Sequence, residues 1–354
     1  MRTGSSPVSE RLLRASSEVM LRLPSRLLSR LAGGTVTNRR GHSLDPQVHM
    51  ILELNRMLGF PELHTLSVEE ARRENARTIR IVSPPAPRMH RVEERRIPSS
   101  HGEIPVRVYH PAATSGTRPG LVYIHGGGFC LCDLDSHDGL CRELAQKGDA
   151  VIVSVDYRLG PEHRFPAAVE DSVAAFRYVQ AHASDFGIDA TRLAIGGDSA
   201  GGNLSAVVCQ TALREGWTPP CFQLLVYPAL ECVERSASRE EFRDGYFLTD
   251  PLIDWFLAQY FGPDADRTRV EASPARATDL RGQPPAHIVA AGFDPLRDDA
   301  EAYATRLEAA GVPVTYQLEP GLIHGFLQLG NVIDAARAAN DRIGRALWRG
   351  LHGN

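Results

Sequence analysis

The chain has 354 residues, of which 43% are hydrophobic, and its net charge is −4. This length suits one large α/β domain with an accessory piece, or two domains, and it can bury a substantial core. The weak negative charge gives no reason to expect nucleic acid or an anionic membrane as a partner, and no run of 18 or more apolar residues predicts a membrane span.

The N-terminal segment is rich in Arg and Ser, and residues 11–31 place Leu, Val and Met at helical spacing among five arginines. A signal peptide needs an uninterrupted apolar core, which these arginines break up. Two interpretations stay open for this arm. It is a helix that packs on the body or frays, or a basic amphipathic helix that makes weak contact with a membrane surface.

The six cysteines contain no CxxC pair, and most of them lie in apolar segments. This pattern favours free core thiols in a reduced compartment over disulfides. We therefore expect a cytoplasmic protein, and nothing in the spacing of its residues predicts a metal site or a cofactor.

Two helices and a hairpin are expected before residue 110. Asp45 is a suitable N-cap for a helix over 44–58, with Pro46 in its first turn. Ser67 and Glu70 have the spacing of a capping box, which predicts a helix over 67–77. Residues 89–109 alternate polar and apolar side chains and break at 99–103, which predicts an antiparallel hairpin at the edge of a sheet.

From Gly120 onward, short β-rich runs alternate with helical segments, which predicts a mainly parallel sheet with helices on both faces. The expected strands are 121–124, 150–155, 193–195, 222–227, 287–291 and 314–318, and the expected helices are 141–147, 167–182, 204–213, 299–310 and 332–348. Residues 231–271 have no clear strand, and Thr249 caps a helix there, so a lid insertion is predicted.

These patterns divide the chain into four parts. Residues 1–85 are the N-terminal arm and cap helices, and 86–230 are the first part of the core. Residues 231–271 are the cap or lid insertion, and 272–354 are the second part of the core.

The segment around Ser199 has the pattern of a strand, a tight turn and a helix, with Gly197 and Gly201 two residues to either side of the serine. This context predicts a nucleophile elbow, in which a strained turn pushes the serine hydroxyl out of the fold. On this motif alone, a plain glycine-rich turn with a capping serine is the alternative.

A nucleophilic serine needs a base and an acid that orients the base. Three histidines follow Ser199, and His324 lies in a glycine-flanked loop just after a strand, whereas the other two start a strand or lie in the tail. Asp294 lies directly after the preceding strand. It is favoured over Asp298, which is better placed to cap the next helix.

Acyl transfer also needs backbone donors for the oxyanion that develops. The run of glycines after His125 follows a strand and meets this need. We expect the amides of Gly126, Gly127 and Ala200 to be the donors, with Gly128 shaping the loop and His125 bracing it. A phosphate-binding loop is the competing interpretation, but the lysine and hydroxyl that such loops use are missing.

Together these residues resemble the hormone-sensitive-lipase-like family of α/β-hydrolases. The resemblance extends from about residue 45 to the end, with alanine usual in the family where Gly160 stands. The segments that carry it are His125–Gly128, Asp133–Asp138, Tyr157–Ala168, Gly197–Asn203, Asp294–Asp298 and His324–Phe326.

The resemblance implies an α/β-hydrolase fold with a helical cap made of the N-terminal helices and the insertion 231–271. It implies that Ser199 is the nucleophile, Asp294 the acid and His324 the base. It also implies hydrolysis of carboxylic esters with short or medium acyl chains. A further implication is that Asp198 anchors a loop rather than taking part in catalysis.

In the segment 157–168, the resemblance implies a polar network that holds a loop near the site. Arg158, Glu162 and His163 would belong to this network and have structural roles.

The sequence therefore predicts a serine carboxylesterase that acts on small-molecule esters through an acyl-enzyme. A ligand-binding scaffold without turnover is one alternative, which the filled base position disfavours. A lipid-surface enzyme or an amidase with the same triad is another. Cap residues such as Phe247, Trp255 and Phe256 are expected to set the acyl-chain preference, and an exposed edge strand near the C-terminus would allow a homodimer.

Overall fold

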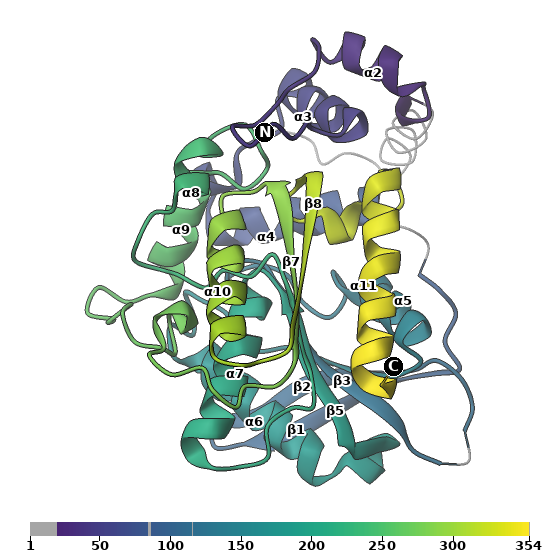
Figure 1. Ribbon diagram of the computed structural model, residues 1–354, viewed down its shortest axis with the longest axis vertical. Helices are drawn as coiled ribbons and strands as arrows, with labels where there is room; N and C mark the ends of the chain where they lie inside the picture. Colours follow the sequence, from purple (N-terminus) through teal and green to yellow (C-terminus); the bar gives the residue numbers. More distant parts are fainter. Residues whose placement is uncertain (1–19, 84–85, 115, 354) are drawn as a thin grey trace.

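One eight-stranded sheet runs through the molecule, in the order β1-β2-β4-β3-β5-β6-β7-β8 (Figure 1). The structure is a computed structural model that describes residues 20–83, 86–114 and 116–353. Its strands are β1 Arg91–Ser99, β2 Gly102–His110, β3 Arg118–Ile124, β4 Val151–Val155, β5 Ile188–Asp198, β6 Gln223–Val226, β7 Ala286–Phe293 and β8 Val314–Ile323.

The strand directions confirm the sheet that the sequence predicts. β1 and β2 form an antiparallel hairpin at one edge, and β2 pairs antiparallel with β4. Every pair from β4 through β8 is parallel. The carboxyl ends of six strands therefore lie at one edge of the sheet, which is where loops can bring distant residues together.

Helices cover both faces of the sheet, with α6, α7 and α10 on one face and α5 and α11 on the other (Figure 1). The α-helices are α2 Ser25–Leu31, α3 Pro46–Leu58, α4 Val68–Val82, α5 Asp138–Gly148, α6 Ala167–Ala181, α7 Ala200–Glu215, α8 Ala237–Glu241, α9 Asp250–Tyr260, α10 Arg297–Ala309 and α11 Asp334–His352. Short 3-10 helices are η1 Leu63–Thr65, η2 Ala183–Phe186, η3 Pro274–Arg276 and η4 Phe326–Leu329.

Strand β3 shows why a parallel sheet of this kind needs both helical layers. Leu121 and Tyr123 belong to the buried cluster that includes α5 and α11, whereas Val122 and Ile124 belong to the cluster that includes α6 and α7. Successive side chains of a strand point to opposite faces, so a strand covered on both faces must be apolar throughout. The sequence of β3 meets that demand.

The predicted helix caps are present. The Asp45 carboxylate accepts hydrogen bonds from the amides of Gln47 and Val48 at the start of α3. Ser67 and Glu70 form the capping box of α4. Helix α4 continues to Val82, five residues beyond the predicted end, because no glycine or proline interrupts it.

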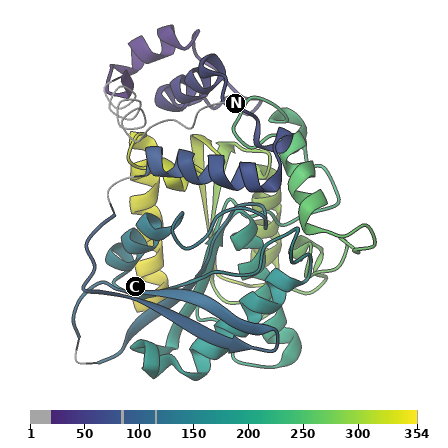
Figure 2. The same cartoon turned by 180° about the vertical axis from the view of Figure 1, so that it is seen from behind.

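The N-terminal helices and the insertion lie beyond the carboxyl edge of the sheet. Figure 2 shows α4, the blue helix, crossing the molecule between the sheet and the α2–α3 pair. The segment 231–271 contains α8 and α9 and, as predicted, no strand. The exact division of the chain at residues 85, 230 and 271 stays a prediction.

The described part of the N-terminal arm packs on the body. Leu21 and Leu28 are buried in one cluster with Val48 and Met50 of α3. Residues 11–19 of the predicted amphipathic stretch lie outside the described residues. None of the helices that the structure describes combines the length and apolar character needed to cross a membrane.

Candidate active site

Ser199 lies on a sharp turn between β5 and α7. Its backbone angles are φ 54° and ψ −117°, a conformation that residues with a side chain rarely adopt. The turn is held by the Ser199 amide, which donates to Val226 O at 2.9 Å. A Cβ atom on Gly201 would lie 1.9 Å from Ile124 O, so only glycine allows the helix to approach the neighbouring strand this closely.

The three residues that the sequence selects for catalysis form one hydrogen-bonded chain. The Ser199 hydroxyl donates to His324 Nε2 at 2.9 Å, and His324 Nδ1 donates to Asp294 Oδ2 at 2.8 Å. Asp294 is fully buried and His324 is 6% exposed. The second carboxylate oxygen of Asp294 accepts the Leu296 amide at 2.8 Å, which fixes the orientation of the acid.

Sheet topology explains why these residues meet. Ser199 follows the last residue of β5, Asp294 follows β7 and His324 follows β8. These strands are parallel and separated only by β6, so their ends lie at the same edge. Asp298, the alternative acid, instead accepts hydrogen bonds from the Ser238 amide and from Arg40, and it faces the cap.

The predicted set of oxyanion donors needs one correction. The amide of Gly126 donates to Asp198 Oδ1 at 3.0 Å, so this N–H is already engaged. Among the hydrogen bonds of the described residues, none uses the amides of Gly127, Gly128 or Ala200. The available donors are therefore the amides of Gly127, Gly128 and Ala200, with Gly128 in place of Gly126.

Asp198 explains why the first glycine of the loop is held in place. Its carboxylate also accepts the Tyr123 hydroxyl at 2.7 Å and lies 3.2 Å from His137 Nε2. Burial acts to raise the pKa of Asp198, but the His137 imidazole and the Tyr123 hydroxyl outweigh it, and the pKa lies below its ordinary value. Asp198 thus stays charged and anchors the loop, as the family resemblance implies.

His125 braces the same loop from its other side. Its Nδ1 donates to Gly126 O at 2.8 Å, and its fully buried ring stacks on Tyr157 with a centroid distance of 4.4 Å. Burial and the nearby His137 lower the pKa of His125 to about 4. The imidazole is therefore neutral near pH 7 and has a structural role.

The polar network in segment 157–168 extends to a residue that the sequence analysis did not select. Arg72 of α4 pairs with both carboxylate oxygens of Glu162 at 2.8 Å. It also donates to Cys130 O at 2.8 Å and to Gly160 O at 2.9 Å. The Cys130 amide in turn donates to Gly127 O, so this arginine links the cap to the oxyanion loop. Arg72 is one of four arginines on α4, and nothing in the sequence marks it for such a role.

Arg158, another member of the expected network, stabilises the loop by pairing with Asp171 and Glu170 of α6. His163 is exposed and its backbone amide donates to Leu159 O, so the role of its side chain stays a prediction.

Tyr227 was also missed by the sequence analysis. It follows β6 with a positive φ of 34°. Its buried ring packs against the ring of His324, with centroids 4.6 Å apart, and so supports this imidazole.

The aromatic cap residues lie on two sides of the catalytic residues. The ring of Phe256 covers Gly128 so closely that a Cβ there would lie 2.2 Å from its Cγ. The ring of Phe247 lies over Gly325, beside His324, and is 47% exposed. The Trp255 ring is 5.3 Å from that of Phe256. Two phenyl rings thus border the site, one at the oxyanion loop and one at the base.

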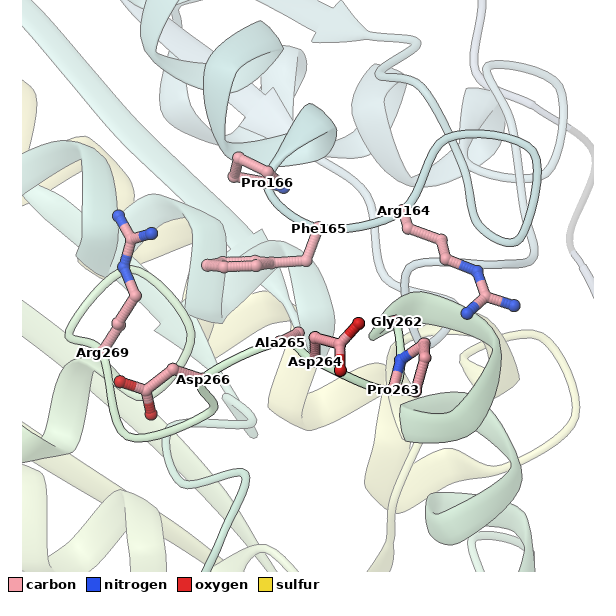
Figure 3. A pocket seen from close by; sticks show the side chains of 9 residues that line it. All are labelled: Arg164, Phe165, Pro166, Gly262, Pro263, Asp264, Ala265, Asp266 and Arg269. Atoms are coloured by element: carbon pink, nitrogen blue, oxygen red, sulfur yellow. The ribbon is translucent and has the colours of Figure 1, made fainter.

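An open cleft of about 400 Å³ lies apart from these residues, where the insertion meets the start of α6. Figure 3 shows that the Arg164 and Arg269 guanidinium groups lie on opposite sides of Phe165, so they do not converge on a common ligand.

Within the described residues, no group of three or more His, Cys, Asp or Glu side chains is placed to hold a metal ion. All six cysteines are free, and burial raises the pKa of Cys130 and Cys132 to about 12.

Comparisons with known proteins identify the family of the chain. A family model for the alpha/beta hydrolase fold matches residues 121–328. Carboxylic ester hydrolase LipN of Mycobacterium tuberculosis is 44% identical over 87% of this chain and 83% of its own length. Carboxylesterase NlhH of the same species is 43% identical over 87% of this chain and 97% of its own length. An ester hydrolase from the metagenome of Lake Arreo, solved with a derivative of bipyridine phosphonate, is 42% identical, with a TM-score of 0.84 over 87% of this chain and 99% of that structure.

Proposed function

The chain belongs to the α/β-hydrolase fold family, as its motifs implied, and from that premise we propose that it hydrolyses carboxylic esters with Ser199 as nucleophile, His324 as base and Asp294 as the orienting acid. The observation that carries this proposal is the continuous hydrogen-bonded chain from the serine hydroxyl to the buried carboxylate. A serine hydroxyl is unreactive near pH 7 unless a neighbouring base accepts its proton.

In the first half of the reaction, Ser199 Oγ forms a bond to the ester carbonyl carbon while His324 Nε2 takes the hydroxyl proton. Asp294 holds the imidazole in the required tautomer and stabilises its positive charge. The tetrahedral intermediate then expels the alcohol oxygen, which receives the proton from His324. The products of this half are the free alcohol and an acyl-enzyme on Ser199.

In the second half, water attacks the acyl carbon and His324 takes a proton from it. The bond to Ser199 Oγ then breaks, the proton returns to the serine and the carboxylic acid leaves. In both halves the negative oxygen of the intermediate is held by the amides of Gly127, Gly128 and Ala200. The last of these begins helix α7, whose N-terminus also favours negative charge.

The substrate class is a small-molecule ester with a short or medium acyl chain. One relative supports the short end of this range, an ethyl acetate hydrolase of Pseudomonas putida that is 35% identical over 83% of this chain. Phe256 and Phe247 border the site on its two sides and are the side chains that would limit acyl length. Turnover on a series of p-nitrophenyl esters from C2 to C16 measures this preference directly.

The central test is Ser199→Ala, assayed for burst and steady-state turnover on p-nitrophenyl butyrate. We expect both to be lost while the thermal unfolding curve is unchanged. Ser205→Ala is the matched control, because its hydroxyl bonds only to Gly201 O within α7. Turnover by Ser199→Ala at the wild-type rate would rule out the assignment.

The cytoplasmic location, the homodimer and the contact of the N-terminal arm with a membrane stay predictions. β8 is the edge strand opposite the hairpin and would be the element that pairs in a homodimer.

A further inference from the structure

Charge is distributed unevenly along the chain. Residues 1–60 contain nine arginines and four acidic residues, whereas the remaining residues contain 30 lysines and arginines and 39 acidic residues. Between residues 20 and 44 there is no acidic residue at all. A basic N-terminal region is thus attached to an acidic body, although the net charge of the whole chain is only −4.

The arginines of this region are exposed and lie beside exposed leucines. Arg22, Arg26 and Arg30 are exposed, and within the described residues none of them forms an ion pair. Leu27 is 41% exposed and Leu31 59% exposed. Residues four apart share one side of a helix, so Arg26 with Arg30 and Leu27 with Leu31 form two adjacent rows on α2.

The exposed leucines are not needed to hold α2 in place. Leu21 and Leu28 anchor the segment, since they are 2% and 1% exposed within the core cluster that also contains Val48. The two outer leucines therefore add apolar surface that the fold does not use. Apolar side chains of this size remain in contact with water at a free-energy cost unless a partner covers them.

Helix α3, which packs against α2, carries further exposed apolar side chains at its C-terminal end. Met57, Leu58 and Phe60 are 74%, 56% and 38% exposed. Of the ten large hydrophobic side chains that are exposed among the described residues, five lie between residues 27 and 60. Both views show α2 and α3 together at one end of the molecule, beyond the ends of β7 and β8 (Figures 1 and 2).

We propose that this basic cap surface docks the enzyme on an anionic lipid bilayer. The surface consists of Arg22, Arg26, Arg30, Leu27, Leu31, Met57, Leu58 and Phe60. The apolar side chains enter the boundary between headgroups and acyl chains, and the guanidinium groups pair with lipid phosphates. The acidic body is repelled by the same membrane, so the charge distribution sets one orientation, with the cap toward the lipid.

Two other partners fit this surface less well. A second copy docked through the same surface would bring six arginines together, and like charges across an interface cost several kcal/mol. A nucleic acid would pair with the arginines but would leave the leucine and methionine side chains without an apolar partner. A bilayer with anionic headgroups pairs with the arginine row of α2 and also covers its leucine row.

The surface is connected to the catalytic edge through the segment that follows α2. Asn38 Nδ2 donates to Gly292 O at 3.0 Å, two residues before Asp294. The Asp45 amide donates to Gly321 O at 2.9 Å, three residues before His324. Docking through the cap thus brings the lipid surface to the side of the molecule that carries the acid and the base. If the enzyme is an esterase as proposed, esters that partition into membranes are within its reach.

The test is sedimentation of the full chain with vesicles of phosphatidylcholine alone and of phosphatidylcholine mixed with phosphatidylglycerol. We expect binding to the mixed vesicles only, and weaker binding at high salt because the charges are screened. Arg26→Gln with Arg30→Gln should lower the partition coefficient about fivefold for each arginine. Leu27→Ser with Leu31→Ser should lower it at every salt concentration.

Arg345→Gln with Arg349→Gln on α11 is the matched control, because it removes the same charge from two exposed arginines on another helix. The proposal is overturned if the wild type does not sediment with mixed vesicles, if it binds neutral vesicles equally well, or if the control loses as much binding as the α2 variant. It is also overturned if the α2 variant changes only the oligomeric state. Turnover of p-nitrophenyl butyrate in the same preparations reports the proposed esterase function separately, and we expect it to be unchanged.

Discussion

Different interactions hold the catalytic edge of the sheet and hold the cap that covers it. At the edge, Ser199, Asp294 and His324 follow parallel strands whose backbone ladders set their positions, and the acid and base are almost fully buried. The cap is attached through side chains instead: apolar ones such as Leu28 and Met50 are buried against the core, and ion pairs add to this packing. Arg72 binds Glu162, and within the insertion Arg239 binds Asp250 of α9.

This difference indicates a division of roles. A backbone ladder fixes atoms to within fractions of an ångström, which proton transfer and attack require. Side-chain ion pairs near the surface contribute little stability each and can rearrange. We therefore expect substitutions at the edge to affect rate strongly and stability weakly, and substitutions in the cap to have smaller effects on rate.

After removal of the nucleophile itself, the largest effect is expected for Asp294→Asn. The amide would favour the wrong tautomer of His324, and kcat should fall about 10⁴-fold on p-nitrophenyl butyrate. Asp298→Asn, only four residues away, should keep nearly full activity because Asp298 bonds to the cap and not to His324. If both variants lost activity equally, the assignment of the acid would be wrong.

The second effect concerns the point where the two regions touch. Gly128→Ala would place a Cβ 2.2 Å from Phe256 Cγ, at a residue with φ of 60°, and should displace one oxyanion donor. We expect kcat to fall about 10²-fold or more. Gly139→Ala, where a Cβ meets nothing within 4 Å, is the control.

The double variant Gly128→Ala with Phe256→Ala separates the two causes of that loss. Partial recovery of kcat would show that the cap ring is responsible. No recovery would show that the strained backbone of the loop is responsible, and the cap would then have no part in this effect.

A smaller loss is expected for Arg72→Ala, which cuts the link between α4 and the loop of the oxyanion donors. kcat should fall about tenfold with little change in KM, because the donors are needed mainly in the transition state. Arg73→Ala is the control, because Arg73 lies on the same helix and its ion pair among the described residues is with exposed Glu69. A loss confined to KM would assign Arg72 to substrate binding instead.

The smallest effect is on stability and concerns Asp299, at the start of α10 where it faces the insertion. Burial, together with Glu231, raises the pKa of Asp299 to about 7. In the unfolded chain this pKa is about 4, so between these pH values the folded state holds a proton that the unfolded state has released. The Asp299 carboxyl therefore lowers the free energy of unfolding progressively as pH rises from about 4 to 7, and this loss reaches its full size above that range.

Asp299→Asn should consequently raise the Tm at about pH 8 and leave it nearly unchanged at about pH 4, where both states are protonated. Thermal scans at the two pH values measure this. Asp264→Asn, at an exposed position of the insertion, should change neither Tm. An equal rise of Tm at both pH values for Asp299→Asn would contradict the ionisation argument.

Several elements were predictable because their causes are local. The Asp45 cap of α3 and the capping box of α4 depend on residues two or three positions apart. The buried strands follow from apolar runs that match a two-sided sheet. The predicted ends of elements were less accurate. Strand β5, for example, begins at Ile188, five residues before the predicted start. Ile188 pairs with Arg118 of β3, and the register then shifts before Leu193 pairs with Gly120, so this extension depends on contacts that a local pattern does not contain.

The sequence by itself determined the parallel sheet, the strained turn at Ser199 and the order of serine, acid and histidine along the chain, because short-range sterics and hydrophobic periodicity set these features. Only the tertiary structure decided which glycine amides remain free, since Gly126 is bound by Asp198 from another strand. It also decided that Arg72 joins the cap to the catalytic loop and that Phe256 covers Gly128. Such contacts join residues from 58 to more than 100 positions apart, and their geometry is set by how the whole sheet and cap pack.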